Sequence, residues 1–368
     1  MDKRQPHLPD LLPLEKLDVA PLAGLIGHAN RAIARFDGKL QGLVNPQLLL
    51  TPMRNQEAVL SSKIEGTQAT LREVLEFEAH PSAKNIAKAP DIQEVINYRL
   101  ALEAGRKEMD SKPLSLNMIR RMHEILMRGV RGGHADPGNF RRIQNWIGTP
   151  GSTMETARFI PPAVPEMMQG LYNWEGYLHE EDGDVLVQLA LLHAQFEILH
   201  PFIDGNGRVG RLLIPLFLFH KQVIHEPVFF MSQILEHHRH DYYHSLKLIT
   251  DRGDWVQWVT FFLDGIIKQS EWNTEQADRI FELYEQMKIE ITLRTKSQWA
   301  IACLDFIFNR PIFSASRFRE ESGVPVASTS RLLAALSESD APLKCIEPGS
   351  GRRPSIYAFP SLLEIINR

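Results

Sequence analysis

The distribution of apolar residues predicts a mainly helical chain. Residues 185–199 are rich in Leu and Ala and contain neither Gly nor Pro, and this length and composition favour a buried helix over a strand. Residues 208–214 begin a second apolar run, which predicts another helix. Pro201 disfavours the α conformation at His200, so the first helix should end near that histidine.

Similar patterns predict the elements on both sides of this pair. Residues 22–36 have helical spacing, and residues 56–67 read as a helix that ends at Gly66, the residue most often found just past a helix C-terminus. Residues 140–148 and 157–162 flank a turn rich in Pro, Gly, Ser and Thr, which predicts a β-hairpin inserted in the helical chain.

The last segment has a different pattern. Helices are expected at 299–308, 314–321 and 327–336, followed by strands at 343–347 and 355–359. This order resembles a winged helix, with Arg331 at the start of the recognition helix and Arg352 and Arg353 at the tip of the wing. We therefore expect three parts: an N-terminal helical region (1–110), a core (111–290) and a winged-helix-like domain (296–368).

Composition narrows the function classes. The 41 basic and 45 acidic residues give a net charge of −4, so no global basic field attracts nucleic acid or membrane. Within 296–368, nine basic residues face seven acidic ones, a weak balance for DNA binding. Two cysteines are too few for a disulfide framework, and no apolar stretch is long enough for a membrane span. We expect a cytoplasmic protein.

The candidate chemistry lies between the two central helices. His200 can take a proton from a hydroxyl group near neutral pH, and Asp204 offers an oxygen ligand suited to Mg²⁺. Glycines then lead into a helix N-terminus, which favours phosphate. Arg208 and Arg211 lie on one face of that first turn, where cations are unfavourable unless an anion compensates them. Together these residues indicate a site for a nucleoside triphosphate.

Gly205, Gly207 and Gly210 also satisfy the G-x-G-x-x-G spacing of a dinucleotide-binding turn. That motif should follow a β-branched strand and precede an acidic residue by about 20 positions. The segment before Gly205 is predicted to be helical, so we reject this interpretation.

Residues 200–211, HPFIDGNGRVGR, resemble the full signature of the Fic family. The resemblance implies transfer of AMP from ATP to a hydroxyl side chain of a protein, with Mg²⁺ as cofactor. It makes His200 the base and Asp204 the metal ligand. It assigns pyrophosphate to Arg208 and the γ-phosphate to Arg211. The expected nucleotide-binding residues are Gly205, Asn206, Gly207, Arg208, Val209, Gly210, Arg211, Tyr242 and Tyr243.

A second motif precedes the signature by more than a hundred residues. Glu65 stands at the C-terminal end of a predicted helix, where a carboxylate is disfavoured unless a cation compensates it. Ser61-x-x-x-Glu65-Gly66 is similar to the inhibitory motif of Fic proteins, placed N-terminal to the core as in class II. The resemblance implies that Glu65 pairs with Arg211 and occupies the place of the γ-phosphate.

Two further segments are assigned through the same resemblance. The predicted hairpin resembles the flap that holds an extended target segment, with Gln144, Trp146 and Ile147 as docking residues. The tyrosines would contact the nucleotide, although helix packing explains them as well. His237 and His240 could share a helix face, but no Cys or paired carboxylate completes a metal site.

We therefore expect an autoinhibited protein adenylyltransferase that acts on a Ser, Thr or Tyr hydroxyl. One alternative is a DNA-binding regulator whose core senses nucleotide, and another is an enzyme that removes AMP from modified protein. The expected partner is a target protein with an acceptor hydroxyl. Self-modification and homodimer formation remain open, as does DNA contact.

Overall fold

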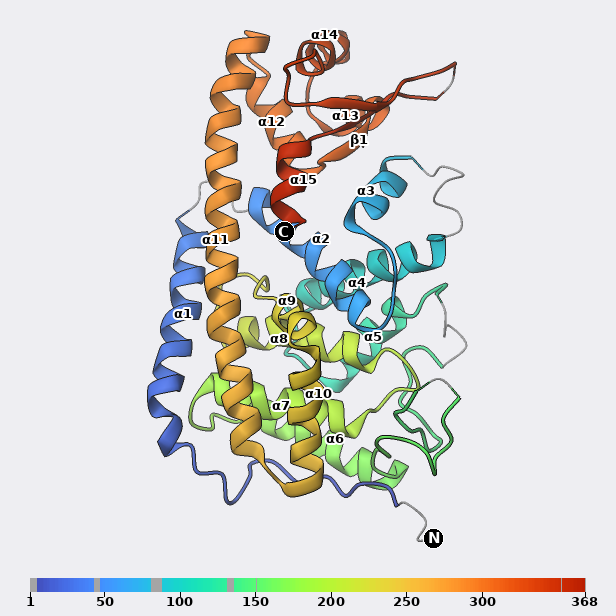
Figure 1. The fold of residues 1–368 in the computed structure, drawn as a ribbon, viewed down its shortest axis with the longest axis vertical. Coiled ribbons are helices and arrows are strands. Elements are labelled where there is room, and N and C mark those ends of the chain that lie inside the picture. The colour runs from blue at the N-terminus through green and yellow to red at the C-terminus, as the bar shows by residue number, and fades with distance from the viewer. Residues whose placement is uncertain are drawn as a thin grey trace. The chain divides into compact units, whose positions relative to one another are not determined.

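The computed structural model describes residues 5–42, 47–80, 88–130, 136–149, 151–351 and 353–367. The fold is mainly helical, with a small three-stranded antiparallel sheet near the C-terminus (Figure 1). Two compact units alternate along the sequence. The first comprises Met1–Gly38, Leu60–Gly66 and Asn97–Glu271, and the second comprises the rest. The three-part division expected from the sequence stays a prediction.

The first unit is built around two consecutive helices, α7 (Val185–Leu199) and α8 (Asn206–His220). Helix α7 has the predicted bounds and packs against α6 (Val164–His179) and α8. Nearly all of its side chains are buried, which explains a sequence without an amphipathic stripe. The other elements are η1 (Ala20–Leu22), most of α1 (Ala23–Gln41), the end of α2 (Gln47–Ile64), most of α4 (Ala89–Glu108), α5 (Leu116–Leu126), α9 (Ser232–His237), α10 (Arg239–Arg252) and the start of α11 (Trp255–Thr295).

The predicted hairpin forms only one antiparallel bridge, between Ile147 and Phe159. Ile147 N–H donates to the Phe159 carbonyl at 2.9 Å, and the described residues on either side have no regular strand. Two features explain the difference. Pro161 and Pro162 have no N–H groups for a ladder, and the Arg141 N–H is used by the Pro201 carbonyl instead. Pro150, in the expected turn, lies outside the described residues.

The second unit contains the sheet. Strands β1 (Ile312–Ser314), β2 (Lys344–Glu347) and β3 (Ile356–Ala358) are antiparallel in the order β1-β3-β2. Helices α12 (Ala300–Asn309), α13 (Ala315–Glu321) and α14 (Val326–Leu336) precede the β2–β3 pair, and α15 (Pro360–Ile366) follows it. Three phenylalanines pack together in the core of this C-terminal segment. Phe306 meets both Phe313 and Phe318 edge to face, and Phe313 and Phe318 are stacked. Helix α3 (Leu71–Ala79) also packs on β1.

The helices and strands of this C-terminal segment lie close to their expected positions. Arg331 is exposed on α14, and Arg353 forms an isolated bridge with Ser350 between β2 and β3. Arg352 lies outside the described residues. Among the residues that the structure describes, no helix combines the length and the apolar character that crossing a membrane requires.

Candidate functional site

The centre of the site is the connection between α7 and α8. His200 ends α7 with φ 46° and ψ 60°, and Gly205 starts α8 with φ 82°. Pro201 keeps His200 out of the right-handed helix, as the sequence predicts, but the left-handed conformation was not expected. For a residue with a Cβ this conformation costs about 1–2 kcal/mol. The chain therefore places the imidazole at this junction at an energetic cost.

The environment of His200 suits a general base. Nδ1 lies 3.4 Å from the Glu197 carbonyl oxygen. Because a carbonyl oxygen can only accept a hydrogen bond, Nδ1 is the donor and carries the proton. In the neutral imidazole the lone pair is then on Nε2. Burial is the largest cause that lowers the pKa of His200 to about 4, and the positive charge of Arg141 acts in the same direction. The imidazole is therefore neutral at physiological pH and has a lone pair on Nε2 that can accept a proton, but its lowered pKa makes it a weaker base than a solvent-exposed histidine.

Asn206 shapes the loop instead of facing a ligand. Its Oδ1 accepts from the Phe202 N–H and its Nδ2 donates to the Phe202 carbonyl, both at 2.8 Å, and the side chain is buried. The expected side-chain contact between Asn206 and phosphate is therefore not the contact seen. The first N–H groups of α8, among them those of Gly207 and Arg208, are the donors that a helix N-terminus offers to an anion. The Val209 N–H, which was also expected to bind nucleotide, donates to the Gly205 carbonyl at 3.0 Å instead.

Asp204 and Arg208 lie together at the start of α8. Asp204 Oδ1 accepts from the Gly205 N–H at 2.6 Å and lies 3.5 Å from Nη2 of Arg208. The Asp204 side chain is 48% exposed, whereas that of Arg208 is 3% exposed. One accessible carboxylate beside a helix N-terminus fits Mg²⁺, which usually takes one or two carboxylates and completes its shell with water and phosphate.

His123, a residue that the sequence reasoning missed, holds the loop that contains Asp204. His123 on α5 is fully buried and stacks on Phe202, with ring centroids 3.8 Å apart and an interplanar angle of 9°. Its Nδ1 accepts from the Gly138 N–H at 2.9 Å, so Nε2 is protonated and donates to the Asp204 carbonyl at 3.0 Å. Only the tertiary structure reveals this role, because His123 lies 81 positions before Asp204.

Glu65 and Ser61 reach the same place from the end of α2. Arg211 is almost fully buried, and its Nη2 donates to Oε1 of Glu65 at 2.6 Å. Its Nε donates to Oγ of Ser61 at 2.8 Å, and Nη2 also donates to the Ser61 carbonyl at 2.9 Å. Arg211 and Arg208 lower the pKa of Glu65 against the opposing effect of burial, so Glu65 is ionised. The expected proximity of Ser61, Glu65 and Arg211 is present.

The end of α2 has anchors besides Arg211. Arg239 donates to the Ile64 carbonyl at 2.6 Å, and Lys63 lies 3.3 Å from Glu236. A cation at the C-terminal end of a helix complements its partial negative charge. Gly66 has φ 99°, which confirms the predicted helix end.

Two glycines of the signature leave room for carboxylates. A Cβ at Gly207 would lie 2.3 Å from Oε1 of Glu65, and one at Gly210 would lie 2.4 Å from Oε1 of Glu197. Oε1 of Glu197 is buried and has no hydrogen-bond partner among the described residues. Burial is the largest cause that raises the pKa of Glu197 to about 7, whereas Arg211 lowers it and Glu65 raises it. Sequence reasoning missed Glu197 as well.

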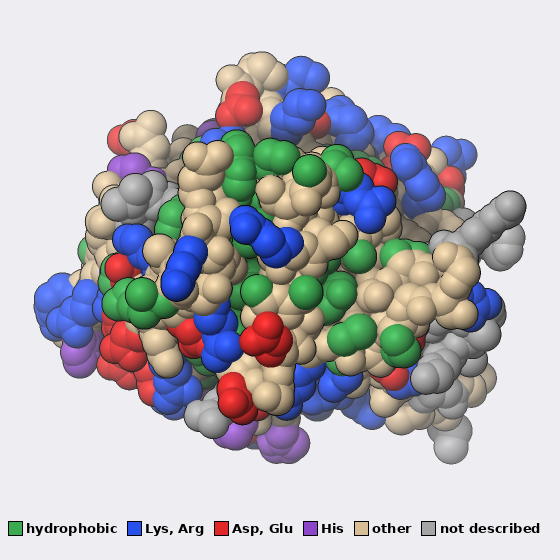
Figure 2. All heavy atoms as spheres, turned by 90° about the horizontal axis from the view of Figure 1, so that it is seen from above, with side chains coloured by type: hydrophobic (Ala, Val, Ile, Leu, Met, Phe, Trp, Pro, Cys, Tyr) green, Lys and Arg blue, Asp and Glu red, His purple; other side chains and the backbone are tan. Residues whose placement is uncertain are grey.

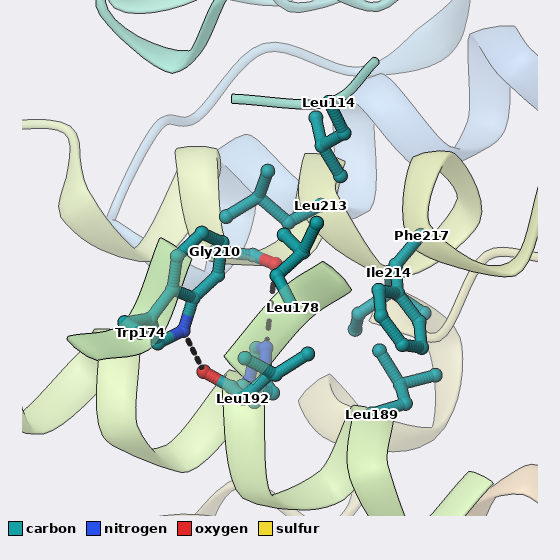
Figure 3. A pocket seen from close by; sticks show the side chains of 10 residues that line it. Leu114, Trp174, Leu178, Leu189, Leu192, Gly210, Leu213, Ile214 and Phe217 are labelled. Carbon is teal, nitrogen blue, oxygen red and sulfur yellow. Dashed lines mark hydrogen bonds between the residues drawn. The ribbon is translucent and has the colours of Figure 1, made fainter. Parts of the chain in front are cut away.

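Tyr242 and Tyr243 have different environments. The Tyr242 hydroxyl donates to Nε2 of His193 at 3.0 Å, and Nδ1 of His193 donates to the Gly210 carbonyl at 3.3 Å. Both His193 and Gly210 line an apolar cavity of about 10 Å³, roughly the space of one water molecule. Figure 3 shows this cavity, with Trp174, Leu189 and Phe217 among the side chains around it. Tyr242 therefore packs in the core, as the alternative interpretation had it. Tyr243 is 43% exposed and is the more accessible candidate for a nucleotide contact.

The expected docking residues surround the Ile147–Phe159 bridge. Trp146 is 44% exposed, and its indole N–H donates to the Ser152 carbonyl at 2.8 Å. Two arms flank the bridge, residues 140–148 and residues 157–162. Gln144 in the first arm donates to the Pro161 carbonyl in the second at 2.9 Å, so a hydrogen bond links the two arms. Target docking on these residues stays a prediction.

The His-rich segment forms no metal site in the part of the chain that is described. His237 ends α9 and His240 belongs to α10, so the two do not share one helix face. No group of three or more His, Cys, Asp or Glu side chains that could hold a metal ion occurs among the described residues.

Comparisons with known proteins agree with this geometry. Residues 23–107 match a family profile described as Fic/DOC family N-terminal, and residues 113–218 match Fic/DOC family. The chain is 31% identical over 211 residues to "Protein adenylyltransferase Fic" of Drosophila grimshawi, which covers 55% of this chain and 39% of that protein. The same-named protein of Culex quinquefasciatus is 29% identical over 260 residues, with 66% and 47% covered. The chain thus spans less than half the length of these curated relatives.

A solved structure extends the similarity of fold to nearly the whole chain. The crystal structure of a Fic family protein from Desulfovibrio desulfuricans G20 matches with a TM-score of 0.59 and 20% identity, covering 97% of this chain and 98% of that one. The two sequence matches adjoin each other and include both the end of α2 and the signature loop. The chain therefore belongs to the Fic/DOC family, as a distant homologue of protein adenylyltransferase Fic.

Proposed function

We propose that this protein is a Mg²⁺-dependent protein adenylyltransferase that Glu65 keeps inactive. The observation that carries the proposal is the ion pair between Glu65 and Arg211 at the N-terminal turn of α8. Two unit charges about 4 Å apart attract by roughly 4 kcal/mol at an effective dielectric near 20, before desolvation is subtracted. A phosphate group that needs Arg211 must first displace Glu65, as in the class II arrangement.

The chemistry follows from the loop. Nε2 of His200 takes the proton of the acceptor hydroxyl, whose oxygen then attacks the α-phosphorus of ATP. The bond to the β-phosphate breaks, and pyrophosphate leaves. The N–H groups of α8, Arg208 and Arg211 neutralise phosphate charge, which is most of what catalysis of phosphoryl-type transfer requires. Asp204 would hold Mg²⁺, which supplies further charge neutralisation.

Labelled nucleotides test the proposal. The wild-type chain and Glu65→Gly are each incubated with ATP, GTP, CTP and UTP that carry an α-phosphate label, and modified residues are located by mass spectrometry. We expect label from ATP on a Ser, Thr or Tyr side chain, of this chain or of a target protein, and more label with Glu65→Gly. If label is incorporated from only one of the other triphosphates, that nucleotide and not ATP is the donor.

Removal of AMP from a modified protein is the second candidate. Glu65 is ionised and lies close enough to His200 for its charge to raise the pKa of that imidazole, so it could also orient a water molecule. The two reactions separate when AMP-modified protein is supplied. A hydrolase releases free AMP and loses this activity on Glu65→Gly, whereas the transferase gains activity from the same substitution.

We also propose that the C-terminal segment is a winged helix with α14 as its recognition helix. A DNA-binding regulator would use Arg331 on α14 and Arg353, which lies between β2 and β3. The third expected DNA contact, Arg352, lies outside the described residues. On the face in Figure 2, the coloured basic side chains are dispersed among apolar and acidic ones. Residues 296–368 contain nine basic and seven acidic residues, and this small net charge favours docking of protein over DNA. Duplex binding that falls steeply with salt and is lost in Arg331→Ala would favour the regulator.

A further inference from the structure

Arg141 is a buried arginine that donates hydrogen bonds to backbone carbonyls. It is 2% exposed, and burial lowers its pKa to about 10, so the side chain stays charged at physiological pH. Nε donates to the His200 carbonyl at 3.0 Å, and Nη2 reaches the Leu199 carbonyl at 3.4 Å. The backbone N–H of Arg141 donates to the Pro201 carbonyl at 2.8 Å. One residue thus binds three consecutive carbonyls around the base.

The same guanidinium binds both arms of the segment around the Ile147–Phe159 bridge. Nη1 donates to the Ile143 carbonyl at 3.2 Å, and Nη2 donates to the Pro162 carbonyl. The rigid, planar fork of Arg can satisfy such divergent acceptors, whereas the single nitrogen of Lys cannot. The Ile143 and Pro162 carbonyls therefore share one guanidinium with the carbonyl of His200.

His200 needs such support because its conformation is strained. A residue before proline prefers extended backbone, yet His200 has φ 46° and ψ 60°. Its N–H is held by the Phe196 carbonyl at 3.1 Å, and its own carbonyl by Arg141. A strained conformation persists only where the surrounding contacts determine it. Within the described part of the chain, Arg141 supplies the side-chain hydrogen bond to the carbonyl of this residue.

We propose that Arg141 is the positioning residue for His200: it holds the base in the left-handed conformation and links its position to the two arms of the target-docking segment. The inference rests on the proposed transferase function for its catalytic consequence. Its structural part, the conformation of His200, does not depend on that function. Phosphate binding should be largely independent of Arg141, because Asn206 closes the loop through Phe202 and the N–H groups belong to α8.

The test compares Arg141→Met and Arg141→Lys, each combined with Glu65→Gly so that transfer can be measured. Arg142→Met in the same background is the matched control, because Arg142 is the adjacent arginine and is exposed. For each protein, kcat and KM for ATP are measured, the Kd of ATP is measured by calorimetry, and a crystal structure gives φ and ψ of His200. A misplacement of about 1 Å can cost roughly 100-fold in rate.

We expect Arg141→Met to lower kcat by about 100-fold while the Kd of ATP changes by less than about threefold. Arg141→Lys should not rescue kcat, Arg142→Met should match its parent, and His200 should leave the left-handed conformation in both Arg141 variants. An unchanged His200 conformation, or a kcat equal to the parent's, overturns the proposal. If Arg141→Met does not fold, the kcat and the His200 conformation of Arg141→Lys decide whether the proposal holds. If the Glu65→Gly parent is itself inactive, the proposed function fails and the His200 conformation alone decides on Arg141.

Discussion

Nη2 of Arg211 donates to Oε1 of Glu65 at 2.6 Å, although 146 positions separate the two residues. The Arg211 side chain is 1% exposed. The Glu65 side chain is 34% exposed, so only the guanidinium is buried, and removing its partner leaves an uncompensated buried charge, which is strongly unfavourable. In the proposed function, Glu65 and a phosphate group of ATP compete as counter-ions for the same guanidinium, and substitutions at the end of α2 should shift this competition.

Ser61→Ala should weaken the inhibitory contact without removing the ion pair. Oγ of Ser61 accepts from Nε of Arg211 at 2.8 Å, and a hydrogen bond to a charged group contributes about 1.5–3 kcal/mol. We expect transfer above wild type and below Glu65→Gly in the labelled-ATP assay. Ser62→Ala is the matched control, because Oγ of Ser62 is buried and has no partner among the described residues. Equal activity of the two alanine variants would refute this role of Ser61.

The low pKa of His200, about 4, predicts an unusual acid limb for transfer. A base whose pKa is lowered is in its active, neutral form at every pH above that value. Glu65 raises the pKa of His200, so Glu65→Gly should lower it further. We expect kcat of Glu65→Gly to stay constant from about pH 8 to about pH 5.5, whereas an ordinary histidine would titrate near 6.5. A decline centred near pH 6.5 in the pH–rate profile contradicts this environment.

His123 should affect Mg²⁺ more than ATP. His123→Leu removes both the stack on Phe202 and the donor to the Asp204 carbonyl. Outer-shell partners of metal ligands typically affect metal affinity or activity by about 10–100-fold. We expect the Mg²⁺ concentration for half-maximal transfer to rise about tenfold, with partial recovery in His123→Gln, which keeps an N–H donor. An unchanged Mg²⁺ requirement in both variants would remove His123 from this role.

Glu197 should make the stability of the protein depend on pH. Its pKa is raised to about 7, mainly by burial, so the native state keeps a proton that the unfolded chain has already lost. The free energy of unfolding should therefore fall as the pH rises from the ordinary Glu pKa towards 7 and then level off. We expect the Tm of Glu197→Gln minus that of wild type to increase over this window. A Tm difference that is constant from pH 5 to 8 would show that Glu197 does not titrate there.

The sequence predicts the local part of the site better than the distant part. Helix α7 could be predicted because Val185–Leu199 is a long apolar run that Pro201 and the glycines terminate. Glu65 could be linked to Arg211 only because a motif resembles a known family. His123 and Arg141 act through backbone carbonyls of other segments, and no sequence pattern marks such contacts. The predicted hairpin was wrong in extent, because its N–H and C=O groups bind the loop and side chains instead of a facing strand.

The most direct measurement compares three proteins with α-labelled ATP and Mg²⁺: wild type, Glu65→Gly, and Glu65→Gly combined with His200→Ala. The account predicts little incorporation of label by wild type, at least about tenfold more by Glu65→Gly, as loss of a contact of about 1.4 kcal/mol or more requires, and none by the double variant. Equal incorporation by wild type and Glu65→Gly, or incorporation that survives His200→Ala, would contradict it.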